Sequence, residues 1–304
     1  MIENLPNQKH SNKPKVYAIV GATASGKTAY SIELAKEIGG EIISADSRLV
    51  YKGFNIACAK PAIEERQGIP HYMMDIVEPE FDYSAGLYAQ QAKVHIYDIL
   101  SRGKVPIVVG GTGLYFRLLL ENYEPPKVKP DYELRNNLKS LSCDDLYNIL
   151  IDIDEEGAKS LESKNDKKKL IRAIEIVQNG GQPLSKQRGI SSKEEFDVIW
   201  LGKNYPRDIL YERINKRVDL MLENGMVEET KYLLKKHGRI SNLVDTIGYK
   251  EIISYLDGIC TLAEALEHLK QNSRKYAKRQ LTWFRKNTHI QWDCYPEPIE
   301  KRKK

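Results

Sequence analysis

The sequence predicts an α/β fold in which a parallel sheet is interrupted by a helical insertion and completed by helices toward the C-terminal end. Short apolar segments alternate with helical patterns along the first part of the chain. A proline-rich connector at 123–130 ends this alternation, and strand character returns only at 197–201. Strands that alternate with helices at this spacing pair in parallel through right-handed crossovers.

Three strands and two helices are predicted before the connector. The strands are 16–20, 41–45 and 105–109, and their continuous apolar character is typical of strands buried on both faces. The helices are 28–38 and 84–102, and glycine follows each of them, as it often does at helix ends.

The rest of the chain is predicted to be mainly helical. Residues 131–192 contain only short helical segments, and the strand at 197–201 is followed by helices at 206–223, 226–237 and 262–286. We therefore expect a core of residues 16–122 and 196–295, a helical insertion of residues 123–195, a flexible leader at 1–15 and a basic tail at 296–304.

Composition excludes several classes of protein. The 304 residues include 47 Lys and Arg, 42 Asp and Glu, and 41% hydrophobic residues, which is ordinary for a globular protein. No apolar run approaches the roughly 18 residues of a membrane-spanning helix, and the polar N-terminal segment has no secretory signal pattern. The four cysteines are far apart, without metal-site spacing. We expect no disulfide framework and a cytoplasmic location.

A phosphate-binding loop follows the first strand. The eight residues fit G-x-x-x-x-G-K-[ST] between a buried strand and a helix, and they are Gly21, Ala22, Thr23, Ala24, Ser25, Gly26, Lys27 and Thr28. Backbone N–H groups at the helix start bind phosphate oxygens, Lys27 adds a full charge, and the Thr28 hydroxyl can hold Mg²⁺. This predicts a P-loop NTPase-like core that binds a polyphosphate or a diphosphate, and the loop alone leaves that choice open.

Polar residues follow two other strands at the same edge of the sheet. Asp46 and Ser47 come after the second strand, and Thr112 lies in a glycine-rich turn after the third. In open parallel sheets this edge carries ligands and catalytic groups. Asp46 could hold Mg²⁺ or act as a base, and the alternative is an Asx turn that only closes the strand.

An ordered set of motifs resembles the tRNA dimethylallyltransferase family, also called tRNA isopentenyltransferase, in its bacterial type. The matching segments are collinear and run from about residue 16 to residue 292. They are 21–28, 44–53, 59–61, 69–71, 110–115, 165–166, 172–175, 217–219, 248–251 and 278–285.

The resemblance implies transfer of a dimethylallyl group from its diphosphate to the exocyclic N6 of the adenosine just 3′ of the anticodon. The loop then binds diphosphate as the leaving group, with Arg217 as a cationic partner and Mg²⁺ at Thr28. Asp46 accepts the proton of N6, and Thr112 contacts the substrates. The expected partners are dimethylallyl diphosphate and the anticodon stem–loop of tRNA, and the enzyme is expected to be a monomer.

A third set of residues is assigned to tRNA binding. Within the predicted helix after Asn165, lysines crowd the first turn, where cations oppose the helix dipole. A nearby phosphate backbone would explain them, and a solvated charge run is the alternative. The full set is Asp46, Ser47, Arg48, Leu49, Arg135, Lys168, Lys169, Arg172, Gly248, Tyr249, Lys250, Lys278, Arg279, Gln280 and Arg285.

The chain departs from the family pattern near the expected site. The family often has Gln at the position of Leu49, Arg at that of Lys169, and Met-Asp-Ile-Gly-Thr where this chain has residues 54–58.

The alternative functions are a small-molecule kinase that uses ATP, prenyl transfer to a free adenine nucleotide, and an inactive RNA-binding protein. Trp283 is expected in the core rather than on a stacking surface, and His71 is given no role.

Overall fold

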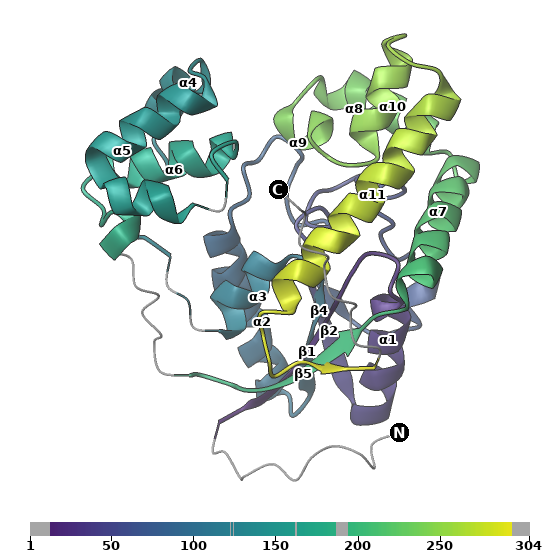
Figure 1. Cartoon of the computed structure of the whole chain (residues 1–304). Helices are drawn as coiled ribbons and strands as arrows, with labels where there is room; N and C mark the ends of the chain where they lie inside the picture. The colour runs from purple at the N-terminus through teal and green to yellow at the C-terminus, as the bar shows by residue number, and fades with distance from the viewer. Residues whose placement is uncertain (1–12, 122, 124, 162, 187–193, 294–304) are drawn as a thin grey trace. The chain divides into compact units, whose positions relative to one another are not determined.

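The chain folds into two compact units, shown in Figure 1. A computed structural model describes residues 13–121, 123, 125–161, 163–186 and 194–293. The core unit comprises Met1–Leu120 and Glu194–Lys304, and the insertion unit is Glu121–Lys193. The predicted tail and most of the predicted leader lie outside the described residues. Lys15, which the sequence assigned to the leader, already belongs to the first strand.

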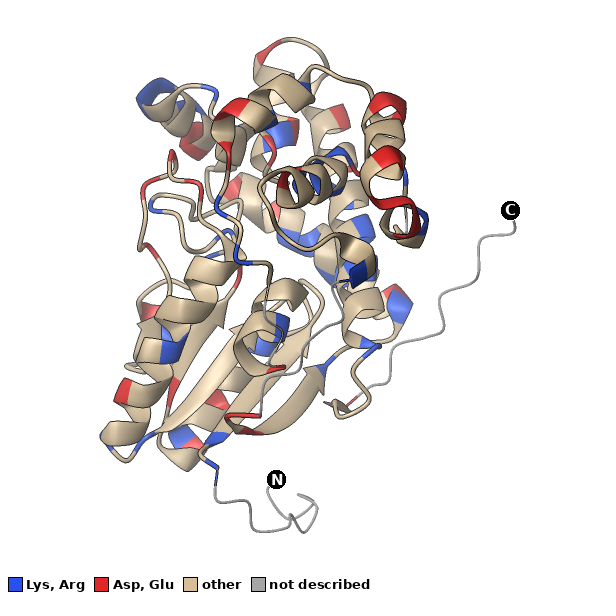
Figure 2. Cartoon of the chain, turned by 90° about the vertical axis from the view of Figure 1, so that its left-hand side faces the viewer, with Lys and Arg blue, Asp and Glu red and all other residues tan. Residues whose placement is uncertain are grey.

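The core unit is built on a parallel sheet of six strands in the described part of the chain, in the order β3-β2-β4-β1-β5-β6. The predicted α/β fold is confirmed. Figure 2 shows the strands almost free of charged positions except near their ends, as a sheet covered on both faces requires. The strands are β1 (Lys15–Gly21), β2 (Gly40–Ala45), β3 (His71–Tyr72), β4 (Val105–Gly110), β5 (Asp197–Lys203) and β6 (Gln291–Trp292).

Helices cover the two faces of this sheet. On one face, Ile32 and Ala35 of α1 (Lys27–Ile38) pack with Ile107 of β4. On the other, α2 (Ala85–Ser101) and α3 (Gly113–Leu120) pack with Val108, the next residue of the same strand. Successive residues of β4 therefore point to opposite layers. Because β1 and β2 both pair with β4 in parallel, the carboxyl ends of the three strands lie at one edge of the sheet.

The C-terminal helices enclose a second apolar cluster around Phe54, Val218, Leu233 and Leu269. Three of them were predicted from the sequence, whereas α9 and α10 were not. Their bounds are α7 (Arg207–Glu223), α8 (Met226–His237), α9 (Ser241–Val244), α10 (Tyr249–Leu256) and α11 (Leu262–Phe284).

The insertion unit is helical in its described residues, with α4 (Tyr132–Lys139), α5 (Cys143–Ser160) and α6 (Lys167–Gln178) around an apolar centre. Its most buried polar group is the Glu175 carboxylate, which accepts hydrogen bonds from Arg135 at 2.7 and 2.9 Å and forms an ion pair with Arg172. Asn165 suits an N-cap by residue type, and the sequence predicts that the helix begins there, which is wrong by one residue. The cap of α6 is Asp166, whose carboxylate accepts the Lys169 N–H.

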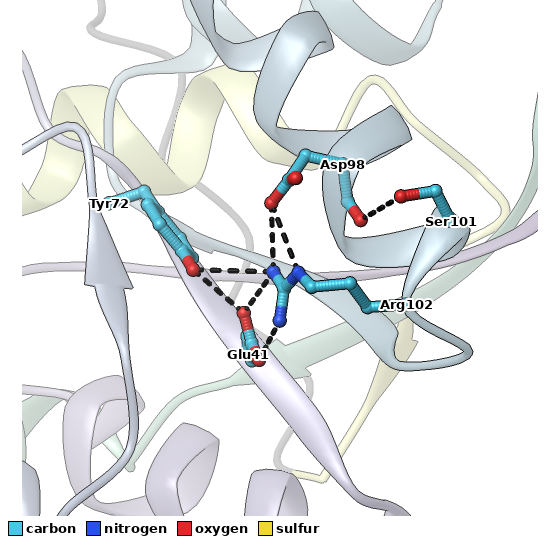
Figure 3. Close-up of polar contacts among 5 residues, drawn as sticks. All are labelled: Glu41, Tyr72, Asp98, Ser101 and Arg102. Carbon is cyan, nitrogen blue, oxygen red and sulfur yellow. Dashed lines mark hydrogen bonds and ion pairs between the residues drawn. The ribbon is translucent and has the colours of Figure 1, made fainter.

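A polar network closes the amino end of β2, opposite the end that carries Asp46 (Figure 3). Buried Glu41 accepts two hydrogen bonds from Arg102, at 2.6 and 2.7 Å, and one from the Tyr72 hydroxyl at 2.8 Å. Asp98 holds the same guanidinium at 2.9 Å. The hydrogen bonds from Arg102 lower the pKa of Glu41 although burial opposes them. This network has only protein partners and belongs to the scaffold.

Candidate active site

A cavity of about 390 Å³ lies in the core unit at the carboxyl ends of β2 and β4. The phosphate-binding loop and Asp46 both line it, together with residues of α7 and α11. Four of its lining residues are cationic and two are anionic, so the wall carries an excess of positive charge. The charged residues are Lys27, Arg48, Arg217, Arg279, Asp46 and Asp245.

Residues outside the phosphate-binding loop hold it through contacts with the loop backbone. Gly21 allows a close crossing, because a Cβ atom there would lie 2.2 Å from the Lys203 carbonyl oxygen. Ala24 adopts a positive φ of 61°, which is rare for a residue with a side chain. Its carbonyl accepts a hydrogen bond from Arg213 Nε of α7 at 2.9 Å. The buried Ser25 hydroxyl has no partner among the described residues. The loop is therefore held in an unusual, preformed shape.

Two cations lie in the cavity without a carboxylate bound to them. Lys27 Nζ donates to the Ala22 carbonyl at 2.5 Å, and Arg217 forms no hydrogen bond within the described residues. Burial, reinforced by the charge of Arg217, lowers the pKa of Lys27 to about 7, although Asp46 opposes the shift. Burial also lowers the pKa of Arg217. An anionic ligand would relieve both costs, because it supplies the missing countercharge.

The strand-end residues are joined by backbone hydrogen bonds. The Asp46 carboxylate accepts the Arg48 N–H at 2.8 Å, so the Asx turn considered from the sequence is present. This is its only hydrogen bond within the described residues, and the side chain lines the cavity. The Thr112 hydroxyl accepts the Ser47 N–H at 3.0 Å. Thr112 itself is not among the lining residues, and it meets the cavity through Ser47 and through a hydrogen bond with Tyr276.

The segment that departs from the family pattern forms part of the cavity wall. Ala57 and Cys58 line the cavity, as does Leu49. Burial raises the pKa of the Cys58 thiol to about 12, so it stays protonated. Glu229 of α8 holds the backbone here, because its carboxylate accepts the Ile56 N–H at 2.9 Å and the Ala57 N–H at 3.2 Å. The same carboxylate accepts the Tyr249 hydroxyl at 2.7 Å.

The structure distributes the predicted tRNA-binding residues over different settings. Asp46, Ser47, Arg48, Leu49, Arg279 and Gln280 line the cavity. Gly248 and Tyr249 are buried, whereas Lys250 and Lys278 are exposed and Arg285 is half-buried at the C-cap of α11. Lys168 and Lys169 are exposed on the insertion unit, where Arg135 and Arg172 bind Glu175.

Two of these residues have polar side-chain atoms that already bind protein groups. The Tyr249 ring is buried and its hydroxyl donates to Glu229. Gln280 is only 5% exposed, and both ends of its amide are bound to backbone groups. Their polar side-chain atoms are therefore engaged inside the protein, and RNA contact by either residue stays a prediction.

Several cavity residues were missed from the sequence, including Tyr276, Ser273 and Thr246. The position of Tyr276 carried a usable signal, since it lies four residues before Gln280 and therefore on the same face of α11. His71, which received no role, also lines the cavity. Its Nδ1 bonds to the Ile69 carbonyl at 2.8 Å, and burial lowers its pKa, so the ring is neutral.

The fold and the site define a protein of the P-loop class with a cavity suited to an anionic ligand. A family model described as IPP transferase matches residues 49–287, and one described as isopentenyl transferase matches residues 14–77. The chain belongs to the tRNA dimethylallyltransferase family, and it is an enzyme of tRNA modification that transfers a prenyl group. The matches over nearly the whole chain are to transferases that act on tRNA, which favours this activity over the small-molecule kinase and the inactive RNA-binding protein.

Individual relatives extend over nearly the whole chain. A tRNA dimethylallyltransferase of Carboxydothermus hydrogenoformans is 42% identical over 294 residues, which is 94% of each chain. The crystal structure of a tRNA isopentenylpyrophosphate transferase from Bacillus halodurans is 40% identical, covers 92% of this chain and 89% of its own, and has a TM-score of 0.70. A eukaryotic dimethylallyltransferase acting on tRNA is 32% identical with a TM-score of 0.77, over 89% of this chain and 70% of its own.

Proposed function

We propose that the cavity transfers the dimethylallyl group of dimethylallyl diphosphate to N6 of the adenosine just 3′ of the anticodon. The observation that carries this assignment is a single cavity lined by the phosphate-binding loop, by Arg217 and by Asp46. The donor and the acceptor of the reaction need these two kinds of group at the same place, because one reactant loses an anion and the other loses a proton.

The cationic side of the cavity fits the diphosphate. As the bond between the allylic carbon and its oxygen breaks, the electron pair leaves with the diphosphate, whose negative charge grows. Lys27, Arg217 and the loop N–H groups are positioned to stabilise that charge. The unpartnered hydroxyl of Ser25 and the absence of a hydrogen bond to Arg217 among the described residues support a ligand here.

Asp46 is the proposed acceptor of the proton from the adenine amine. The N6 lone pair is delocalised into the ring, so the amine is a weak nucleophile and gains from a base as the bond to carbon forms. The position of Asp46 at the end of β2 supports this role, since Asp46 shares the cavity with the loop and only one hydrogen bond engages its carboxylate. Thr112 and Tyr276 would orient the turn beside it.

Mg²⁺ fits the oxygen donors of the cavity. Thr28 is an exposed residue that lines the cavity, and Asp46 lines the same cavity. The described residues contain no group of three or more His, Cys, Asp and Glu that could hold a metal by themselves. That donor set suits a cation that takes most of its ligands from phosphate oxygens and water. When bound, Mg²⁺ would neutralise part of the diphosphate charge.

The insertion unit is proposed to contact the anticodon stem–loop through its exposed lysines. Lys168 and Lys169 lie on α6 with exposed side chains. Contacts to phosphates position an RNA without reading its sequence.

No helix in the described part of the chain has the length and apolar character needed to cross a membrane.

The test replaces Asp46 by Asn. The asparagine side chain keeps the shape of the aspartate, but it cannot accept the proton from N6. We expect single-turnover prenyl transfer to fall by roughly 10²–10⁴-fold, the usual size of a general-base effect. Binding of tRNA and of the diphosphate should change much less. The matched control is Asp98→Asn, which removes a carboxylate of the Glu41 network at the other end of the sheet and should leave the rate unchanged.

A magnesium series separates the two roles of Asp46. Full recovery of D46N at high Mg²⁺ would assign the carboxylate to metal binding alone. A rate within about threefold of wild type, far below the general-base range, would remove Asp46 from the mechanism.

A further inference from the structure

We propose that Gln280 is a positioning residue of the transfer reaction, because it fixes the phosphate-binding loop relative to the turn that carries Thr112. The inference rests on the proposed function, in which these two segments serve the donor and the acceptor. Gln280 lies on α11, far from both segments in the sequence, and its side chain is 5% exposed.

The amide of Gln280 uses its two ends on the two segments. Its Oε1 accepts the N–H of Thr23, in the phosphate-binding loop, at 2.8 Å. Its Nε2 donates to the carbonyl oxygen of Gly111 at 3.1 Å. One neutral side chain therefore bridges two loops that face the same cavity.

The fit around this amide leaves little room for another arrangement. A Cβ atom at position 111 would lie 2.0 Å from Nε2, so the glycine allows the amide to reach the backbone. The helix is also held on both sides of Gln280. Ala277 packs with Ala22 and Ile214, and Phe284 packs with Phe116 against the sheet. The bridge thus starts from a fixed point.

Hydrogen bonds continue from the bridge to the proposed base. Gly111 precedes Thr112, whose N–H donates to the Ala45 carbonyl at 3.2 Å and whose hydroxyl accepts the Ser47 N–H at 3.0 Å. Ala45 and Ser47 flank Asp46. A continuous path therefore runs from the diphosphate loop through Gln280 and Thr112 to the backbone on either side of Asp46.

Only an amide satisfies both ends of the bridge. A glutamate could accept from Thr23 but could not donate to Gly111 while ionised, and a methionine could do neither. Losing the bridge leaves a buried N–H and a buried carbonyl free to shift toward other partners. A displacement of about 1 Å between reacting groups can cost roughly 100-fold in rate. The effect should therefore appear in turnover rather than in binding.

The experiment measures single-turnover prenyl transfer for Gln280→Met and Gln280→Glu, alone and combined with Thr112→Val. We expect each single Gln280 variant to slow transfer by about 10- to 100-fold, with binding of inorganic diphosphate and of tRNA within about threefold of wild type. In the Thr112→Val background the further loss should be less than about threefold, because the two residues act through one turn.

The control is Thr230→Val, which removes an equally buried hydrogen bond, from the Thr230 hydroxyl to the Met226 carbonyl, away from the cavity. It should lower thermal stability and leave the rate unchanged. The variant with glutamate keeps the measurement possible if the methionine variant does not fold. Losses at Gln280 and Thr112 that simply multiply would overturn the proposal, as would a loss confined to binding.

Failure of the proposed function would look different. If wild type forms no N6-prenylated adenosine in tRNA, or if Asp46→Asn turns over as fast as wild type, the proposed function is wrong whatever Gln280 does. If Asp46→Asn is slow and Thr112→Val is as fast as wild type, the path through Thr112 is overturned and the cavity assignment stands. If Thr112→Val is slow and Gln280→Met is fast, the cavity assignment stands and only the bridge is removed.

Discussion

The core unit and the insertion unit use the same kinds of cationic side chain in opposite ways. In the core cavity, neither Lys27 nor Arg217 has a carboxylate bound to it within the described residues. In the insertion unit, Arg135 and Arg172 both bind the fully buried Glu175. All four were assigned to ligand binding from the sequence. The comparison teaches that a cation bound to a buried carboxylate is less available to a ligand than a cation without a counterion.

The largest effect on activity should follow from removing a cation that has no bound carboxylate. Arg217→Met takes away charge at the leaving group, and we expect kcat/KM to fall by about 10²–10³-fold, as for other single donors to a developing anion. Thermal stability should be unchanged or higher, because a buried charge without a counterion is costly to the fold. Transfer rates test the predicted loss of activity, and a melting curve tests the predicted stability. A clear drop in melting temperature would contradict the comparison.

For Arg135 and Arg172, which bind a carboxylate, the expected effect is on stability rather than on activity. Glu175→Gln leaves two guanidiniums without their carboxylate, and we expect the insertion unit to lose about 3 kcal/mol of stability, the low end for a broken buried pair because both arginines are partly exposed. Hydrogen exchange of the α6 amides in the full chain measures this. Glu155→Gln, which breaks a solvent-exposed ion pair with Lys159, should leave the hydrogen exchange of α6 nearly unchanged.

The pH dependence of Glu175 has a definite sign. Burial raises its pKa, but the hydrogen bonds led by Arg135 lower it by more, so the net pKa is lowered. Its stabilisation is therefore complete above the pKa of the unfolded state and is lost as the pH falls through the lower folded value. Protection of α6 that did not weaken in acid, or that weakened equally in E175Q, would speak against this ion pair.

The smallest effect concerns the protonation of Lys27. Since its pKa is lowered to about 7, the free enzyme carries mostly neutral Lys27 at pH 8. Diphosphate favours the charged amine, so binding above pH 7 should take up a proton, and affinity should fall by up to about tenfold per pH unit. Calorimetry in buffers of different ionisation enthalpy measures the uptake.

Lys27→Met provides the reference for that measurement, because titration of the ligand itself is common to both proteins. Wild type should take up more protons than the variant at pH 8. Equal uptake by the two proteins would mean that Lys27 is already charged in the free cavity, as a lysine with an ordinary pKa would be.

Local signals made much of the fold and part of the site predictable. The loop at 21–28, the strands around it and Asp46 follow from residues that are neighbours in the sequence. Strands β3 and β6 have two residues each, too few to show a pattern. Trp283 was expected in the core, and this is wrong, because its side chain is 37% exposed beside Gly113.

The remaining roles depend on contacts between distant residues. Arg135 and Arg172 look like surface cations until Glu175 is found between them, and Gln280 looks like part of a basic RNA-facing helix until its amide meets Thr23 and Gly111. The sequence showed which residue types are present. Only the packing shows which of their polar atoms are already satisfied.

Glu229 accepts hydrogen bonds from the backbone N–H groups of Ile56 and Ala57. These hydrogen bonds affect which substitutions this wall of the cavity can tolerate. Because the carboxylate binds main-chain N–H groups, these two contacts do not depend on which side chains occupy positions 56 and 57. Substitutions at these two positions can therefore keep the hydrogen bonds to Glu229. Asn55, Ala57 and Cys58, which depart from the family pattern, therefore occupy a segment whose backbone is held from another helix.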